Sequence, residues 1–239
     1  MPRNRDRSCK LPAGLAKYRN SVAKARFSRH GVPSSKRARG GQRNENLPFA
    51  PPEDWYPPSE TPVQPWRIVV QPPGEGYRHI VTASEIRKRL AQLPSQLLRT
   101  LEVVQLSRMT RKKQTFPCYG MQWGSSLYLY PLEEPLVEYF DRPPHPNLVN
   151  ETRMYGGRWV HEAPSTWKLI WTETAIKDFY LNNILIHELG HLLDERNSNS
   201  VERERYAEWF AIEYGYRPSR SGRSATRRPV RRRHHRRAG

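Results

Sequence analysis

The chain has 239 residues, of which 36% are hydrophobic, and a formal net charge of +18. This length suits one folded domain with flanking segments, and no apolar stretch is long enough to span a membrane. Its two cysteines, Cys9 and Cys118, exclude a disulfide-rich scaffold and favour a reducing compartment. The start of the chain has no apolar core of a secretory signal, so we expect a cytoplasmic protein, with an organellar transit peptide as the alternative.

The positive charge lies at the two ends of the chain. Residues 1–45 carry 13 Lys and Arg against 2 acids, and residues 217–239 carry 10 Arg and no acid, whereas residues 46–216 hold 18 bases against 21 acids. Neither end has an apolar pattern that could offset chain entropy, so we expect both to be disordered tails. Such tails could hold the protein on nucleic acid or on an acidic partner.

Residues 46–65 are rich in proline and are expected to form an extended lead-in to a single folded domain at 66–216. Five segments of this domain have the β-branched and aromatic content of strands. They are 66–71, 101–107, 126–131, 153–161 and 167–172. Between the first two, a helix is expected at 84–93, where Thr82 and Glu85 have the spacing of a capping box. Strands followed by helices indicate an α+β fold with a small mixed sheet.

A helix expected at 174–195 carries the run His187-Glu188-Leu189-Gly190-His191. Residues four apart on a helix return to one face, roughly 6 Å apart along the axis, so the two imidazoles can bind one ion. The carboxylate of Glu188 then lies beside the ion, where it can take a proton from metal-bound water. Apolar residues surround most of this helix and indicate that it is buried. The alternative to a metal site is a pair of core histidines satisfied by hydrogen bonds.

A catalytic zinc ion has three protein ligands and one open position for water. The only histidines after His191 lie in the C-terminal tail, so the third ligand is expected to be acidic. A second helix is expected at 201–215, where Glu204 and Glu208 share a stripe with two alanines. Because small side chains let helices approach closely, either carboxylate could reach the ion.

The run HELGH, followed by ERYAEWFA at 204–211, resembles the gluzincin pattern of HExxH plus ExxA(D/N/E)xFA, which includes small bacterial metallopeptidases. This resemblance covers residues 174–216 and implies a zincin-like fold, in which a mixed sheet flanks the active helix. It makes Glu204 the third zinc ligand. It puts Glu208, the alternative third ligand, where the family usually has a residue that orients a ligating histidine. An edge strand would line the cleft and could pair with an extended peptide.

These residues predict a zinc metalloendopeptidase that hydrolyses a protein or peptide. Zn²⁺ would activate water, and Glu188 would take its proton and deliver it to the leaving amine. Several side chains are candidates for stabilising the tetrahedral oxyanion. They are Tyr206, Tyr214, Tyr216, His161 and Arg203.

Two other interpretations remain open on the sequence. The protein could be a nucleic-acid-associated binding protein with a structural or inactive zinc site, because its Arg-rich tails would neutralise phosphates. Cys118 could cap the zinc as an inhibitory thiolate, although a lone cysteine is more often a small buried residue.

Overall fold

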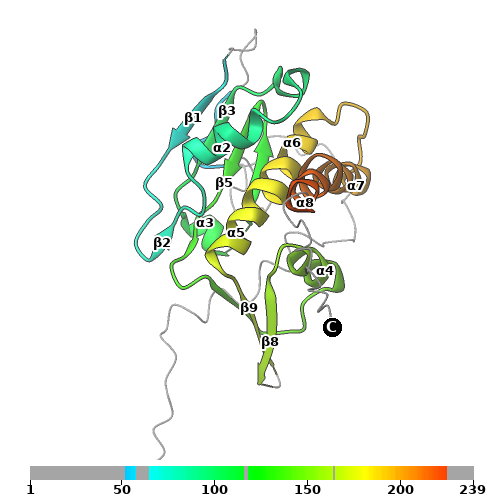
Figure 1. Ribbon diagram of the computed structural model, residues 1–239. Coiled ribbons are helices and arrows are strands. Elements are labelled where there is room, and N and C mark those ends of the chain that lie inside the picture. Colours follow the sequence, from blue (N-terminus) through cyan, green and yellow to red (C-terminus); the bar gives the residue numbers. More distant parts are fainter. Residues whose placement is uncertain (1–51, 58–64, 116–117, 164, 225–239) are drawn as a thin grey trace, which may run out of the picture.

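The computed structural model describes residues 52–57, 65–115, 118–163 and 165–224. The tail expected at 1–45, most of the Pro-rich lead-in and the end of the Arg-rich tail lie outside these residues, as does Cys9. The described chain has an α+β fold, with a four-stranded mixed sheet on one side, two long helical segments beside it and a small three-stranded sheet at one end (Figure 1).

The four-stranded sheet has the strand order β1-β3-β5-β4. Its strands are β1 (Arg67–Val70), β3 (Val103–Leu106), β5 (Ser126–Leu129) and β4 (Gly120–Trp123). The first three are parallel, and β4 pairs antiparallel with β5 at one end of this order. The strands predicted at 66–71, 101–107 and 126–131 are confirmed, whereas β4 was not predicted.

The two central strands of this sheet are its most buried ones. All residues of β3 and β5 are buried, as expected for parallel strands in an α/β arrangement. The helix α2 (Ala83–Leu90) connects β1 to β3, and its capping box is present as predicted. The Thr82 hydroxyl accepts a hydrogen bond from Glu85 N at 3.2 Å, and the Glu85 carboxylate accepts one from Thr82 N at 2.8 Å.

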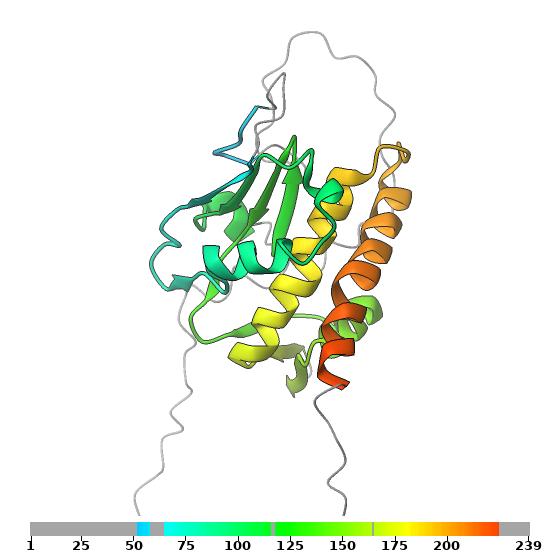
Figure 2. The same cartoon turned by 45° about the horizontal axis from the view of Figure 1, so that its top comes forward.

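Two long helical segments lie side by side next to this sheet (Figure 2). The first comprises α5 (Glu173–Phe179), a π-helical turn η3 (Tyr180–Ile184) and α6 (Leu185–Leu193). The second comprises α7 (Ser200–Ala211), a π-helical turn η4 (Ile212–Tyr216) and α8 (Arg217–Ser224). The helices predicted at 174–195 and 201–215 are confirmed in position, but neither π-helical turn was predicted.

The C-terminal tail was predicted to be disordered from residue 217, but its first residues, 217–224, form helix α8. Arg220 explains why this polar segment folds. Its guanidinium pairs with the buried carboxylate of Asp178 at 2.6 Å and lies over the ring of Tyr216, 4.6 Å from its centroid. Tertiary contacts of this kind stabilise a helix that has little apolar surface of its own.

The three-stranded antiparallel sheet has the order β7-β9-β8. Its strands are β7 (Val137–Phe140), β9 (Thr166–Ile170) and β8 (Arg158–Ala163). The strand predicted at 153–161 is wrong in its first part, because α4 (Pro146–Met154) occupies it and Gly156, with φ 93°, turns the chain before β8. The strand predicted at 167–172 ends early, because the Thr172 side chain caps α5.

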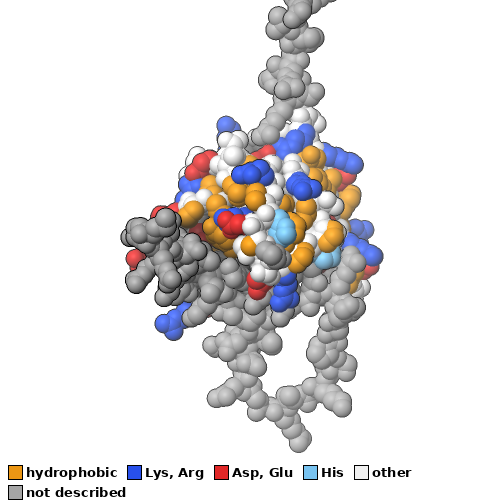
Figure 3. Space-filling view, turned by 90° about the horizontal axis from the view of Figure 1, so that it is seen from below, with side chains coloured by type: hydrophobic (Ala, Val, Ile, Leu, Met, Phe, Trp, Pro, Cys, Tyr) orange, Lys and Arg blue, Asp and Glu red, His pale blue; other side chains and the backbone are white. Residues whose placement is uncertain are grey.

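Four shorter elements complete the described fold. They are β2 (Tyr77–Arg78), which pairs with β6 (Leu132–Glu133), the 3₁₀ turn η2 (Ser95–Leu98) and α3 (Arg111–Thr115). At the end of the molecule that carries β8 and β9, hydrophobic side chains intermingle with Lys, Arg and His on the surface (Figure 3). None of the described helices combines the length and apolar character that crossing a bilayer requires.

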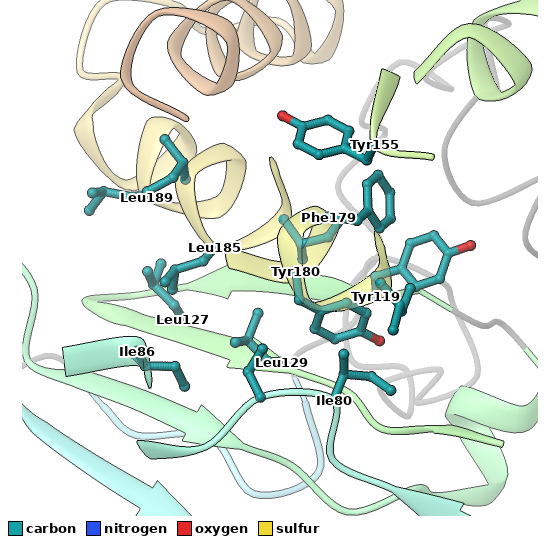
Figure 4. Packing of buried hydrophobic residues seen from close by; sticks show 14 of the residues in the cluster. Ile80, Ile86, Tyr119, Leu127, Leu129, Tyr155, Phe179, Tyr180, Leu185 and Leu189 are labelled. Atoms are coloured by element: carbon teal, nitrogen blue, oxygen red, sulfur yellow. The ribbon is translucent and has the colours of Figure 1, made fainter. Parts of the chain in front are cut away.

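The core lies between the four-stranded sheet and the first helical segment. Leu127 and Leu129 of β5 face Leu185 of α6, and aromatic rings continue the packing toward the other sheet (Figure 4). Tyr119, for example, packs edge-on against Phe179 with 5.3 Å between ring centroids. Close packing on this side holds α6 firmly beside the sheet.

Candidate metal centre

Three side chains from two helices converge at one point of the structure. His187 and His191 project from α6 with 3.1 Å between their Nε2 atoms. Glu204 on α7 reaches both, because its Oε2 lies 3.4 Å from His187 Nε2 and its Oε1 lies 3.5 Å from His191 Nε2. Among the described residues, this is the one group of His, Cys, Asp or Glu side chains that could hold a metal ion.

The separations between these ligand atoms match the geometry of a zinc site. Zinc bonds of about 2.0–2.1 Å in a tetrahedron place the ligand atoms about 3.3–3.4 Å apart. The two Nε2 atoms are 3.1 Å apart, close to this value, and each lies 3.4–3.5 Å from a different carboxylate oxygen of Glu204. Two imidazoles and one carboxylate are also a donor set that zinc prefers, and a tetrahedron formed by three ligands leaves one corner open.

Small residues on the facing helices make this convergence possible. Gly190, between the two histidines, lies so close to α7 that a Cβ there would be 3.0 Å from Ala207 Cα and 3.1 Å from Phe210 Cβ. At the other end of the helix pair, a Cβ on Gly215 would overlap the carbonyl of Asn182. The close approach lets the Glu204 side chain span the gap to α6.

The Glu204 carboxylate is electrostatically suited to bind a cation. Partial burial opposes its ionisation, but hydrogen bonds and charge interactions with His187 and His191 outweigh burial and hold the pKa of Glu204 well below its usual value. The imidazole side chains are only 15% and 13% exposed, whereas the Glu204 side chain is 50% exposed. The two imidazoles are therefore mostly buried, whereas the Glu204 side chain on α7 is open to solvent.

Glu188 lies beside this group but belongs to a different environment. It is 7% exposed and faces the first residue of β4, where a Cβ on Gly120 would be 2.9 Å from both its Cγ and its Oε1. Helix α6 therefore presents its two histidines to α7 and its acid to the end strand of the sheet. That is the arrangement expected of a base that sits beside a metal without ligating it.

The end of α6 is tied to α7 by Arg203, which precedes the acidic ligand in sequence. Its guanidinium donates to the backbone carbonyl of His191 at 3.1 Å and to that of Asp194 at 3.4 Å. His191 lies in the last turn of α6 and Asp194 is its C-cap residue, where backbone carbonyls lack most of their intrahelical donors. Arg203 thus caps α6, a role different from the oxyanion stabilisation considered for it.

The other sequence candidates lie outside the group formed by the two histidines and Glu204. Tyr206 is about 200° around α7 from Glu204 and packs against Trp209. Tyr214 is about 15 Å further along the second helical segment and stacks on Phe210 at 4.5 Å.

Three further candidates also have other surroundings. Tyr216, in η4, lies under Arg220, and His161 stacks on Trp167 of the neighbouring strand, with 4.3 Å between ring centroids. Cys118 accepts a hydrogen bond from Lys113 Nζ at 3.1 Å and is not among the residues that could hold the metal.

Of the two acids proposed as third ligand, only Glu204 is in the metal group. Glu208 lies one turn further along α7 and is exposed. Gly120, which lies against Glu188, was not predicted from the sequence. In its segment, Gly-Met-Gln-Trp, the alternation of apolar and polar residues extends over only three residues, which is too short to predict a strand.

Comparisons of the chain with family models, with curated proteins and with solved structures each gave no match.

Proposed function

We propose that this protein is a zinc-dependent metalloendopeptidase of zincin-like fold that hydrolyses a protein or peptide substrate. The observation that carries the proposal is the convergence of His187 Nε2, His191 Nε2 and the Glu204 carboxylate, with 3.1 Å between the two nitrogens and 3.4–3.5 Å from each nitrogen to one carboxylate oxygen, because one ion could contact all three side chains. A structural zinc site would instead use a fourth protein ligand. Among the described residues, the group contains three.

When bound, zinc would polarise the scissile carbonyl and lower the pKa of a water molecule toward about 7. Glu188 is placed to act as the general base, since it neighbours His187 in sequence but is turned toward β4. It takes the proton from the attacking water and delivers it to the leaving amine. His187, His191 and Glu204 hold the ion in place through two helices that pack tightly together.

The position of β4 favours an extended peptide as substrate. This strand pairs only with β5 in the described sheet, and its first residue, Gly120, contacts Glu188. A peptide that paired with the outer edge of β4 would gain main-chain hydrogen bonds and run past the proposed general base. Main-chain recognition of this kind suits cleavage within a chain rather than at one specific terminus.

The zincin-like assignment rests on the same arrangement. The metal-binding helix α6 packs under a mixed sheet, next to its antiparallel strand β4, and the following helix α7 supplies the acidic ligand. These are the features that the gluzincin resemblance of residues 174–216 implies.

Metal analysis of the purified full chain tests the site. We expect about one zinc per chain in the wild type, loss of zinc in Glu204→Gln, and retention in the matched variant Glu208→Gln, whose carboxylate lies outside the group. Equal zinc content in all three proteins would show that Glu204 is not a ligand. Loss of zinc in Glu208→Gln alone would identify Glu208, and not Glu204, as the third ligand.

Hydrolysis is tested separately with Glu188→Gln. This variant keeps all three ligands, so it should bind zinc as the wild type does while peptide cleavage falls by at least about a thousandfold. A mixture of unstructured proteins, analysed by mass spectrometry, serves as substrate. Equal cleavage by the wild type and Glu188→Gln would remove Glu188 as the base, and zinc binding without any cleavage would favour a structural site.

A further inference from the structure

A small hollow lies at the carboxyl ends of the three parallel strands, and none of the three candidate metal ligands lines it. Its lining includes Gln71, Ser107 and Tyr130, which directly follow β1, β3 and β5. Residues 52–54 and the α3 region complete the lining. The carboxyl ends of parallel strands are common ligand sites in open sheets. The hollow measures about 10 Å³, which is close to the minimum that holds one water molecule.

Two side-chain atoms in this lining are buried without a hydrogen-bond partner among the described residues. They are the hydroxyl of Tyr130, which is 3% exposed, and Oε1 of Gln105, which is 2% exposed. Buried polar atoms are almost always paired with protein or with a bound molecule. Burial also raises the pKa of Tyr130 well above its usual value, so its hydroxyl keeps its proton and can donate.

The third polar group is a buried ammonium. Lys113 is 4% exposed, and its Nζ lies 4.3 Å from the centroid of the Tyr130 ring and 3.1 Å from Cys118 Sγ. Within the described part of the chain, no carboxylate lies within ion-pair distance of Lys113. A buried cation is costly unless a negative group accompanies it.

The amide of Gln105 can present either of its ends to the hollow. Its Nε2 lies 3.0 Å from Ser107 Oγ. Because a hydroxyl can donate as well as accept, turning the amide over keeps this contact and places the NH₂ group where Oε1 now lies. The hollow would then be surrounded by donors from Tyr130, Gln105 and Lys113. Three donors directed at one hollow are suited to an anion.

We propose that this hollow is a binding site for a small monovalent inorganic anion, for which chloride is the probe. The neighbouring acid Asp54 does not oppose this, because its carboxylate is paired with Arg108 at 3.2 Å and accepts from Gln71 at 3.1 Å. The lining also contains one further cation, Lys112, and one further acid, Glu53. The competing occupant is a single water molecule.

Chloride binding to the full chain is measured by broadening of the chloride NMR signal. Lys113→Met should weaken binding at least tenfold, because a charge-assisted contact is lost. Tyr130→Phe, which removes one oxygen and leaves the ring in place, should weaken it severalfold. Lys88→Met, which removes the same charge from an exposed position on α2, is the control and should change nothing. Circular dichroism checks that each variant is folded.

Three results would overturn the proposal: no specific broadening in the wild type, equal broadening in Tyr130→Phe and wild type, or broadening that appears only after Cys118→Ala. The last result would mean that the Cys118 thiolate is the counter-ion of Lys113. Crystals soaked in bromide provide an independent test of where the anion binds. An anomalous peak beside Tyr130 Oη and Lys113 Nζ supports the site, whereas a water molecule there overturns it. Both readouts are independent of peptidase activity.

Discussion

Gly120 on β4 and Glu188 on α6 touch so closely that no side chain fits between them. A Cβ at residue 120 would lie 2.9 Å from Glu188 Oε1 and 2.7 Å from Ile184 Cγ2. Real Cβ atoms do not approach other groups to this extent, so either the strand or the acid would have to shift. The strand proposed to hold the substrate and the proposed general base are therefore in direct contact.

Gly120→Ala should uncouple hydrolysis from metal binding. The added methyl displaces Glu188 but leaves His187, His191 and Glu204 in place, so we expect kcat/KM to fall at least tenfold while zinc content stays near one per chain. Overpacking should also cost about 1–3 kcal/mol of the free energy of unfolding. Peptide cleavage assays and metal analysis on the same preparation measure both effects. Full activity in this variant would show that the contact between β4 and Glu188 does not matter for hydrolysis.

Gly190→Ala, in contrast, should weaken metal binding. Its methyl would lie 3.0 Å from Ala207 Cα, so α7 must move away by a few tenths of an ångström and take Glu204 with it. We expect zinc affinity to fall about tenfold or more, as seen when the support of a metal ligand is disturbed. Competition with a chromophoric chelator gives the affinity. Unchanged affinity would mean that the helix spacing at Gly190 does not govern the reach of Glu204.

The parts of this site that depend on helical periodicity could be predicted from sequence. His187 and His191 are four residues apart on a strongly apolar segment, which is enough to bring their rings together. To predict Glu204 as a ligand, two further observations were needed. These were the stripe of small residues on its helix and the gluzincin resemblance. The contact between Gly120 and Glu188 could not be predicted from a sequence pattern, because it depends on the pairing of Gly120 with Leu129 in the sheet.

The elements missed in the fold have tertiary causes. Helix α8 is rich in Arg and Ser, and a segment of that composition is expected to be disordered. Its contact with Asp178, 42 residues earlier, cannot be read from the local sequence. The π-helical turns η3 and η4 likewise lie against each other, where Gly215 meets the backbone of Asn182. Such turns arise from packing between helices rather than from propensity.

Arg203→Met should destabilise the end of α6, the helix proposed to bind the metal. The substitution removes donors from the carbonyls of His191 and Asp194, and we expect a loss of about 1–2 kcal/mol in the free energy of unfolding together with weaker zinc binding. Arg203→Lys should restore part of both. The control is Arg205→Met, whose side chain is 66% exposed and pairs with Glu202 in the same helix, and which should change stability by less than about 0.5 kcal/mol. Equal effects at 203 and 205 would contradict the capping role.

The capping box of α2 predicts a pH dependence of stability. Burial of the Glu85 carboxyl opposes its ionisation, but hydrogen bonds from Lys177 and Thr82 outweigh burial and hold the pKa of Glu85 below the ordinary 4.5. A carboxyl whose pKa is lower in the folded state stabilises the fold fully above its unfolded pKa, and this contribution is lost as the pH falls through the folded pKa. Glu85→Gln lacks the contribution at every pH.

We therefore expect Glu85→Gln to be less stable than the wild type by about 0.5–1 kcal/mol at neutral pH, with the difference shrinking below about pH 4. Denaturant unfolding at a series of pH values measures it. Glu75→Gln, in the exposed turn before β2, removes the same charge without this hydrogen-bond network and should follow the wild type throughout. Zinc release in acid affects all three proteins alike, so it does not alter the differences between them. A constant difference between Glu85→Gln and the wild type down to about pH 3 would show that the Glu85 carboxylate gains nothing from Thr82 and Lys177.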